Sequence, residues 1–213
     1  MSETTTPATA RTDVRPGART ARPADGPPPT RAVGVGLAAT ATLFAVTMAY
    51  GGPEASAATA RIVDLAGLTF QVALFGLLAV MRRTAATGAG RAGRGLLYVE
   101  GALLGVASVW SILHATVPAG VQEAPWMIAL DAFWPLSMSG MTVVGVVVAV
   151  VGRWRGALRW WTAAGCAWFV ASIPVAVLFE GAAGGVLGVA YMIVGYGGLG
   201  VLLAARPALA VRG

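Results

Sequence analysis

The stretch WMIALDAFWPLSMSGMT, residues 126–142, is an apolar segment of helical length that carries an acid and a proline inside it. Asp131 lies about one and a half turns inside this segment, where a carboxylate in a membrane costs about 2.5–3.5 kcal/mol. Pro135 has no N–H and its ring crowds the carbonyl of Asp131, so we expect the helix to kink where its charge sits. The segment is therefore predicted to face other helices or a hydrated cavity rather than lipid.

The composition around this segment is that of a membrane protein. Apolar residues make up 57% of the chain and charged residues 11%, whereas soluble domains have about a quarter charged residues. Splitting the chain by hydropathy gives six segments near the ~20 residues that span a bilayer. The expected fold class is all-α, a polytopic bundle of six transmembrane helices at residues 32–51, 62–81, 96–117, 126–151, 160–179 and 184–205.

The basic residues are distributed by membrane side. There is no lysine, and every arginine except Arg61 lies before the first segment, after the last, or in the second or fourth connection. The positive-inside rule therefore predicts cytoplasmic N- and C-termini in the cell membrane. The net charge of +6 does not predict a nucleic-acid partner, because the arginines are not interleaved with exposed aromatic residues. The expected partner is the lipid bilayer, and the composition is typical of a high-GC bacterial genome.

The two ends of the chain differ from the middle. Residues 1–30 are rich in Thr, Pro, Ala and Arg without an apolar period, which predicts a disordered cytoplasmic tail. Residues 31–206 form the predicted transmembrane domain, and residues 207–213 a short cytoplasmic tail. We expect the first segment to be an uncleaved span, because its apolar run exceeds the 7–15 residues of a signal-peptide core.

Polar residues align along the predicted helices. Glu100, Ser111 and His114 share one face of the third segment, but Glu100 and His114 are about 21 Å apart along the helix axis and cannot share one site. His114 and Asp131 have similar depths on either side of a short connection. They are predicted either to set each other's proton affinity or only to join the two helices.

Other polar and small residues have simpler interpretations. Asp64 lies at the start of the second segment, where the helix macrodipole favours an anion. Gln71, seven residues later on the same face, is expected to bond a neighbouring helix. Pro174 predicts a kink in the fifth segment. GxxxG spacings in the third and sixth segments, at Gly101 and Gly105 and at Gly184 and Gly188, predict close helix packing.

No motif assigns a reaction. The chain lacks nucleotide-binding loops, a nucleophile elbow, an HExxH motif and a Cys/His cluster. Its one cysteine, Cys166, cannot form an internal disulfide or a zinc site alone. The absence of lysine excludes a retinal Schiff base. We therefore expect neither a metal nor a cofactor.

Three functions remain open. The first is a metal-independent intramembrane cyclase or isomerase that acts on a lipophilic, isoprenoid-like molecule, because apolar surroundings keep a carboxylic acid protonated and indole faces stabilise a cation. In size and layout the chain resembles the small polytopic terpene cyclases of secondary metabolism. The candidate catalytic residues are Asp131, Glu100 and His114, and the candidate substrate-binding residues are Trp110, Trp134, Trp168, Gln71 and Ser111. The second is a small proton-coupled transporter, which at this size would need a homodimer. The third is a structural or regulatory membrane subunit.

Overall fold

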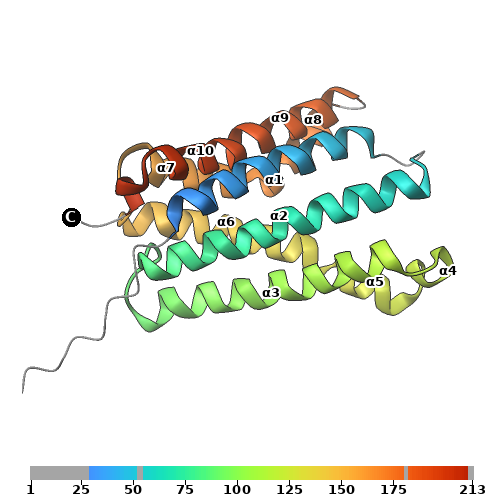
Figure 1. Ribbon diagram of the computed structural model, residues 1–213, viewed down its shortest axis with the longest axis horizontal. Coiled ribbons are helices and arrows are strands. Elements are labelled where there is room, and N and C mark those ends of the chain that lie inside the picture. Colours follow the sequence, from blue (N-terminus) through green and yellow to red (C-terminus); the bar gives the residue numbers. More distant parts are fainter. Residues whose placement is uncertain (1–28, 52–54, 180–181, 211–213) are drawn as a thin grey trace, which may run out of the picture.

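The computed structural model describes residues 29–51, 55–179 and 182–210, and this part of the chain is helical without a strand (Figure 1). The elements are α1 Thr30–Tyr50, α2 Ala57–Arg83, α3 Arg91–Thr116, α4 Ala119–Gln122, α5 Pro125–Asp131, α6 Phe133–Val151, α7 Gly156–Cys166, α8 Trp168–Leu178, α9 Ala182–Met192, the π-helix η1 Ile193–Gly197, α10 Gly198–Ala205 and the 3-10 helix η2 Pro207–Ala210. The predicted all-helical bundle is confirmed.

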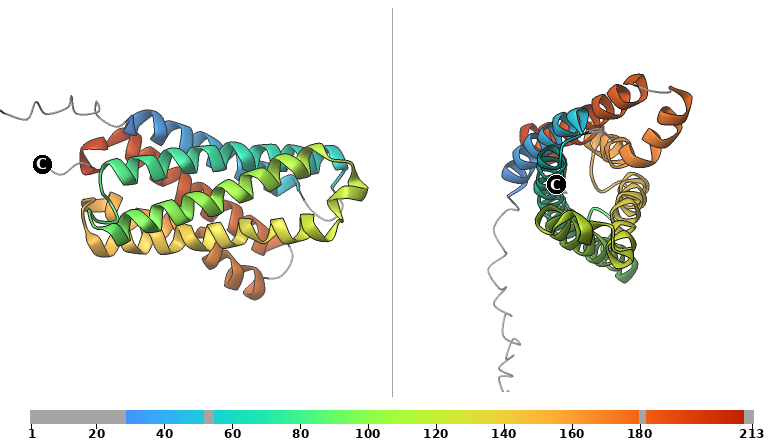
Figure 2. Two further views of the ribbon diagram at one scale, coloured as in Figure 1. Left: turned by 90° about the horizontal axis from the view of Figure 1, so that it is seen from below. Right: turned by 90° about the vertical axis from the view of Figure 1, so that its right-hand side faces the viewer.

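The helices pack in a ring that follows the order of the chain. α1 packs on α2, α2 on α3, α3 on α6, α6 on α7 and α7 on α10, and α10 returns to α1. Figure 2 shows this ring along its axis, with the α8 and α9 pair leaning out from its side. Fully buried apolar side chains from different helices fill the interior, among them Leu37, Phe70, Leu104, Val144 and Leu199.

The closure of the ring between α1 and α10 depends on two glycines. A Cβ on Gly34 would lie 2.5 Å from the nitrogen of Ala204, and one on Gly200 would lie 2.5 Å from the carbonyl oxygen of Gly34. No side chain fits there, so the two backbones touch. The prediction of close approach at Gly101 and Gly105 is wrong, because a Cβ at either position would meet nothing within 4 Å.

Five helical segments of the described chain are long and apolar enough to cross a membrane, and α7 with α8 would make a sixth as one bent span. Large apolar side chains such as Val72, Val99 and Val150 are exposed on the outside of the bundle. The bundle is therefore compatible with an integral membrane protein, because lipid rather than water can cover such side chains.

The fourth span is interrupted beside its acid, as predicted. α5 ends at Asp131 and α6 begins at Phe133, with Ala132 between them. Pro135 has no N–H to give to the carbonyl of Asp131, and the next amide, that of Leu136, bonds Ala132 at 3.2 Å. The carboxylate of the span therefore lies at a break in its helix.

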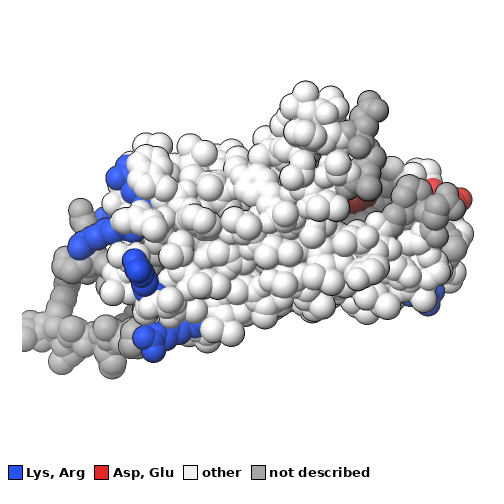
Figure 3. All heavy atoms as spheres, turned by 90° about the horizontal axis from the view of Figure 1, so that it is seen from above, with Lys and Arg blue, Asp and Glu red and all other residues white. Residues whose placement is uncertain are grey.

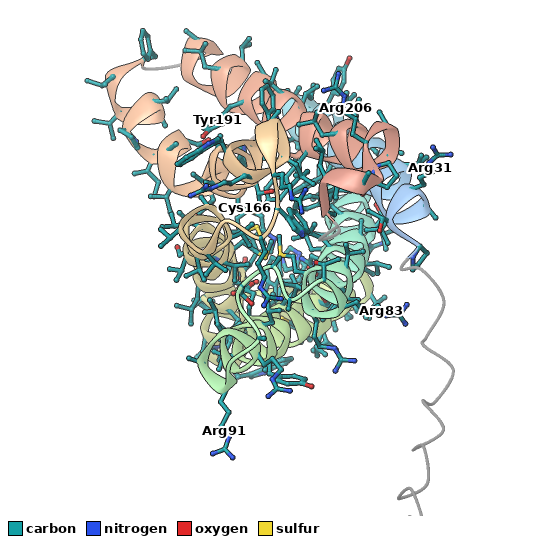
Figure 4. The ribbon with its side chains drawn as sticks, turned by 90° about the vertical axis from the view of Figure 1, so that its left-hand side faces the viewer. Arg31, Arg83, Arg91, Cys166, Tyr191 and Arg206 are labelled. Atoms are coloured by element: carbon teal, nitrogen blue, oxygen red, sulfur yellow. The ribbon has the colours of Figure 1, made fainter. Side chains whose placement is uncertain are left out.

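The fifth span bends by 54° at Ala167, between α7 and α8, and not at Pro174, which lies inside α8. The predicted position of the kink was therefore wrong. Hydroxyls from other helices hold the carbonyls next to the bend: Thr142 Oγ1 donates to Cys166 at 3.0 Å, and Tyr191 donates to Ala164 at 2.8 Å. Figure 4 shows Tyr191 beside α7 and Cys166 inside the bundle. These hydroxyls replace helix hydrogen bonds and so permit the bend.

One end of the bundle, which we call the arginine end, carries the charged ends and loops of several helices. Figure 3 shows most of the basic residues of this face gathered there, and acidic residues together with a smaller basic patch near the opposite end. In Figure 4 the labelled arginines, Arg31, Arg83, Arg91 and Arg206, point outward around the perimeter of this end. Trp154 closes the interior here: it is fully buried and its Nε1 donates to Thr84 Oγ1 at 3.0 Å.

Both ends of the described chain lie at the arginine end (Figure 1). Of the predicted N-terminal tail, only residues 29 and 30 fall within the described residues, and Thr30 already begins α1. Residues 207–210 of the predicted C-terminal tail form η2, where the carbonyl of Leu209 accepts a hydrogen bond from the amide of Arg155 at 3.0 Å. Residues 211–213 lie outside the described residues.

Candidate functional site

An acid and a histidine on neighbouring helices form a close pair at the end opposite the arginine end. His114 Nδ1, on α3, lies 2.7 Å from Asp64 Oδ2, on α2. The indole of Trp110 stacks on the imidazole, with ring centres 4.8 Å apart. Gln122 Nε2 donates to the carbonyl of His114 at 2.7 Å. The histidine is thus held on its ring face, at Nδ1 and at its backbone.

The partner of His114 is therefore Asp64 and not Asp131. Asp131 is close enough to interact electrostatically with both members of the pair, but hydrogen bonding within the described residues joins His114 to Asp64. Both α2 and α5 pack on α3, and the contact of Asp64 with His114 places the two side chains at the same depth. The predicted proximity of His114 and Asp131 is retained, whereas the direct bond between them is not among the described contacts.

Asp64 and Asp131 line one pocket of about 180 Å³. Its lining residues come from α1, α2, α3, α5 and α6, and they are Phe44, Val63, Asp64, Gly67, Gln71, Trp110, Ser111, Asp131 and Trp134. Asp131 is an exposed residue, so its predicted shelter among neighbours is only partial: it stands at the wall of a pocket but is not buried.

Aromatic rings make up much of the apolar wall. Trp134 stands edge-on to Phe44, with ring centres 6.4 Å apart, and edge-on to Trp168, at 6.3 Å. Trp168 does not line the pocket of the two acids. It lines a larger pocket of about 490 Å³ between α1, α8 and α9, and its Nε1 donates to the carbonyl of Gly188 at 2.8 Å.

Gln71 and Ser111 join α2 to α3 below the acids, as the sequence predicted for Gln71. Gln71 Nε2 donates to Ser111 Oγ at 2.9 Å, and Ser111 donates to the carbonyl of Ala107 at 3.2 Å. Gln71 Oε1 and Trp110 Nε1 are buried and have no hydrogen-bond partner among the described residues. An acceptor and a donor are thus left over among the side chains that line the pocket.

Glu100 lies outside this pocket. It is 1% exposed, and its Oε1 accepts a hydrogen bond from Ser137 Oγ at 2.7 Å, while its Oε2 is without a partner in the described chain. A Cβ on Gly140 would overlap that Oε2. Between Glu100 and the pocket, α3 presents Leu104 and Ala107, which have no exposed surface. The structure thus leaves Glu100 apart from His114, as their spacing predicted.

Sequence reasoning missed Asp64 as a member of the site, together with the apolar wall residues Phe44, Val63 and Gly67. A signal for Asp64 was present, because it shares a helix face with Gln71. Among the described residues, no three His, Cys, Asp or Glu side chains are grouped closely enough to hold a metal ion. No protein-family model, curated protein or solved structure matches the chain.

Proposed function

We propose that the protein is a multi-pass protein of the cell membrane with the arginine end on the cytoplasmic side. The supporting observations are the exposed apolar side chains around the bundle and the gathering of arginines at the end where the described chain begins and finishes. In this orientation the pocket of Asp64 and Asp131 lies toward the outer leaflet.

We propose further that this pocket binds a lipophilic molecule and that Asp131 gives it a proton. The observation that carries this proposal is that two carboxylates, Asp64 and Asp131, face one aromatic-walled pocket. They are not equivalent, because Asp64 pairs with His114 at 2.7 Å, whereas Asp131 lines the pocket without such a pair in the described chain. Asp131 is accordingly the donor, and Asp64 with His114 the acceptor.

The chemistry that suits this arrangement is proton-initiated cyclisation or isomerisation of an isoprenoid-like alkene. Asp131 protonates one carbon of a C=C bond, and the cation that results lies among the rings of Phe44, Trp110 and Trp134, whose faces favour positive charge. In cyclisation, a second C=C bond of the same molecule adds to the cation and closes a ring. In isomerisation, no ring forms and the cation stays where it arose. In either case the cation then loses a proton from a neighbouring carbon to Asp64, so the product is an isomer of the substrate.

Incubation in heavy water tests this proposal. Membranes that contain the protein are given polyprenyl alkenes, and the products are analysed for isomerisation and for deuterium bound to carbon. Turnover is expected for the wild type and for Glu123→Gln, an exposed acid outside the pocket, and a loss of at least 100-fold, about the effect of a positioned acid, is expected for Asp131→Asn. Unaltered turnover in Asp131→Asn contradicts the role of Asp131. A loss of turnover in Glu100→Gln alone would instead indicate that Glu100, in the core of the bundle, is the catalytic acid.

One observation favours a proton-coupled carrier as the second candidate. The chain holds two ionisable sites at different depths, the Asp64–His114 pair and Glu100, as expected for a relay across the membrane. Against it, the fully buried Leu104 and Ala107 separate the two sites. A carrier predicts uptake into vesicles that depends on a pH gradient, whereas the enzyme predicts product formation without one. A structural subunit predicts neither.

A further inference from the structure

Two polar atoms near the acids lack partners, and their kinds are complementary. Gln71 has no exposed surface, and its amide nitrogen is already used by Ser111, so Oε1 remains as an acceptor. Trp110 Nε1 remains as a donor while its ring stacks on His114. A buried polar group without a partner costs about 1–3 kcal/mol. A ligand group that supplied both partners would recover that free energy.

Two further pockets adjoin the pocket of these two side chains. That pocket shares Val63 and Asp64 with a pocket of about 280 Å³, which in turn shares Met48 and Gly51 with the pocket of about 490 Å³. The wall of this last pocket is mostly apolar or small, with Trp168, Ala176 and Val189 among its residues. A molecule with a small polar head and a long apolar body would fit these three adjoining pockets.

We propose that the site recognises a lipophilic alcohol, with the hydroxyl between Gln71 and Trp110 and the hydrocarbon body along α1 toward α8 and α9. This inference rests on the proposed binding of a lipophilic molecule and names its polar head. A hydroxyl donates one hydrogen bond, to Gln71 Oε1, and accepts another, from Trp110 Nε1. It therefore supplies the kind of partner that each of the two atoms lacks.

The surroundings disfavour other head groups. A carboxylate or phosphate would meet the two acids that line the pocket, Asp64 and Asp131, and no arginine is among the described residues that line it. A ketone or ether accepts a hydrogen bond but has none to donate to Gln71, and an ammonium group donates but cannot accept from Trp110. A hydroxyl is the smallest neutral head that both donates to Gln71 Oε1 and accepts from Trp110 Nε1.

Binding of a radiolabelled C20 prenol to the purified protein in phosphatidylcholine nanodiscs tests the inference, with its methyl ether and parent hydrocarbon as competitors. The prenol is expected to bind about tenfold more tightly than the ether, since one hydrogen bond in a buried site contributes about a factor of ten in affinity. Trp110→Phe keeps an aromatic ring against His114 and removes the donor, so it is expected to weaken prenol binding about tenfold and to leave hydrocarbon binding unchanged.

Two further variants keep the test decisive. Gln71→Leu removes the acceptor and is expected to give the same selective loss, and Trp126→Phe, an exposed tryptophan outside the three pockets, is the matched control. Equal affinity for prenol and ether in the wild type overturns the inference and assigns the orphan atoms to an ordered water. Tight prenol binding without deuterium incorporation supports the inference but contradicts the proposed enzyme.

Discussion

His114 Nδ1 and Asp64 Oδ2 lie 2.7 Å apart, although 50 residues of chain separate them. The pair joins α2 to α3 at the same level at which Asp131 closes the pocket from α5. Asp64 thus contacts His114 on one side and shares the wall of a pocket with Asp131 on the other.

The first prediction concerns the energy of this pair. Asp64→Asn and His114→Gln are each expected to lower stability, and the double variant to lose less than the sum, with a coupling of about 0.5–3 kcal/mol. Thermal unfolding of the purified protein in detergent measures all three. Glu123→Gln, combined with either variant, is the control and is expected to be additive. Full additivity of Asp64→Asn with His114→Gln would show that the interaction between the two side chains contributes nothing to stability.

The second prediction concerns Glu100. Gly140→Ala places a Cβ on the Oε2 of Glu100, so it is expected to destabilise the protein by about 1–3 kcal/mol, as overpacking of a core does. Gly105→Ala is the matched control, since a Cβ there meets nothing within 4 Å. The control is expected to be neutral or to stabilise by about 0.5–1 kcal/mol through helix propensity. Equal effects of the two substitutions would contradict the buried position of Glu100.

The third prediction concerns the contact between α1 and α10. Gly34→Ala forces apart two backbones that touch, because its Cβ would lie 2.5 Å from the nitrogen of Ala204. Gly36→Ala, on the same helix, adds a methyl group into open space. Only the first variant is expected to lower the unfolding temperature and to increase proteolysis after α9. A comparable loss in Gly36→Ala would contradict backbone crowding at Gly34 as the cause, because alanine has a higher helix propensity than glycine and a Cβ at position 36 meets nothing within 4 Å.

The fourth prediction concerns the bend at Ala167. Thr142→Val and Tyr191→Phe each remove a hydroxyl that bonds a carbonyl beside the bend, and each is expected to cost about 1–3 kcal/mol of stability. Thr42→Val is the control, because Thr42 bonds only its own helix, at Ala38. Pro174→Ala is expected to leave stability unchanged or raised, since a proline inside a helix costs about 3 kcal/mol. A larger loss of stability in Pro174→Ala than in Thr142→Val would indicate that the proline, and not the hydroxyls, supports the bend.

The fifth prediction concerns orientation. In a Cys166→Ala background, Glu123→Cys and Ala92→Cys each put a thiol at an exposed position, near opposite ends of α3. A membrane-impermeant maleimide is expected to label Glu123→Cys in intact cells and Ala92→Cys only after permeabilisation. The reverse pattern would place the arginine end outside.

Features that depend on one segment were predictable from the sequence. The all-helical class, the span that contains Asp131 and the break beside it followed from hydropathy and from Pro135, and the separation of Glu100 from His114 followed from helix rise. These are properties of a helix in isolation. They do not require knowledge of which helix is its neighbour.

Features that depend on two segments were not predictable in the same way. The bend at Ala167 is supported by hydroxyls from Thr142 and Tyr191, which lie on other helices and leave no mark on the sequence of α7. Likewise, matching depths favoured Asp131 as the partner of His114, but Asp64 stands at an equivalent depth on the other side of α3. Which of the two acids bonds His114 depends on how each helix is rotated about its own axis. Sequence spacing does not fix that rotation.

The return of the last helix to the first has a consequence for biogenesis. α2, α3, α6 and α7 each pack on a helix that comes shortly before them in the chain, whereas α9, η1 and α10 pack on α1 at the start of the described chain. The contact between α1 and α10 at Gly34 and Gly200 can form only when synthesis of the chain is almost finished. A nascent chain stopped before residue 198 would lack α10 and leave the side of α1 around Gly34 without its packing partner.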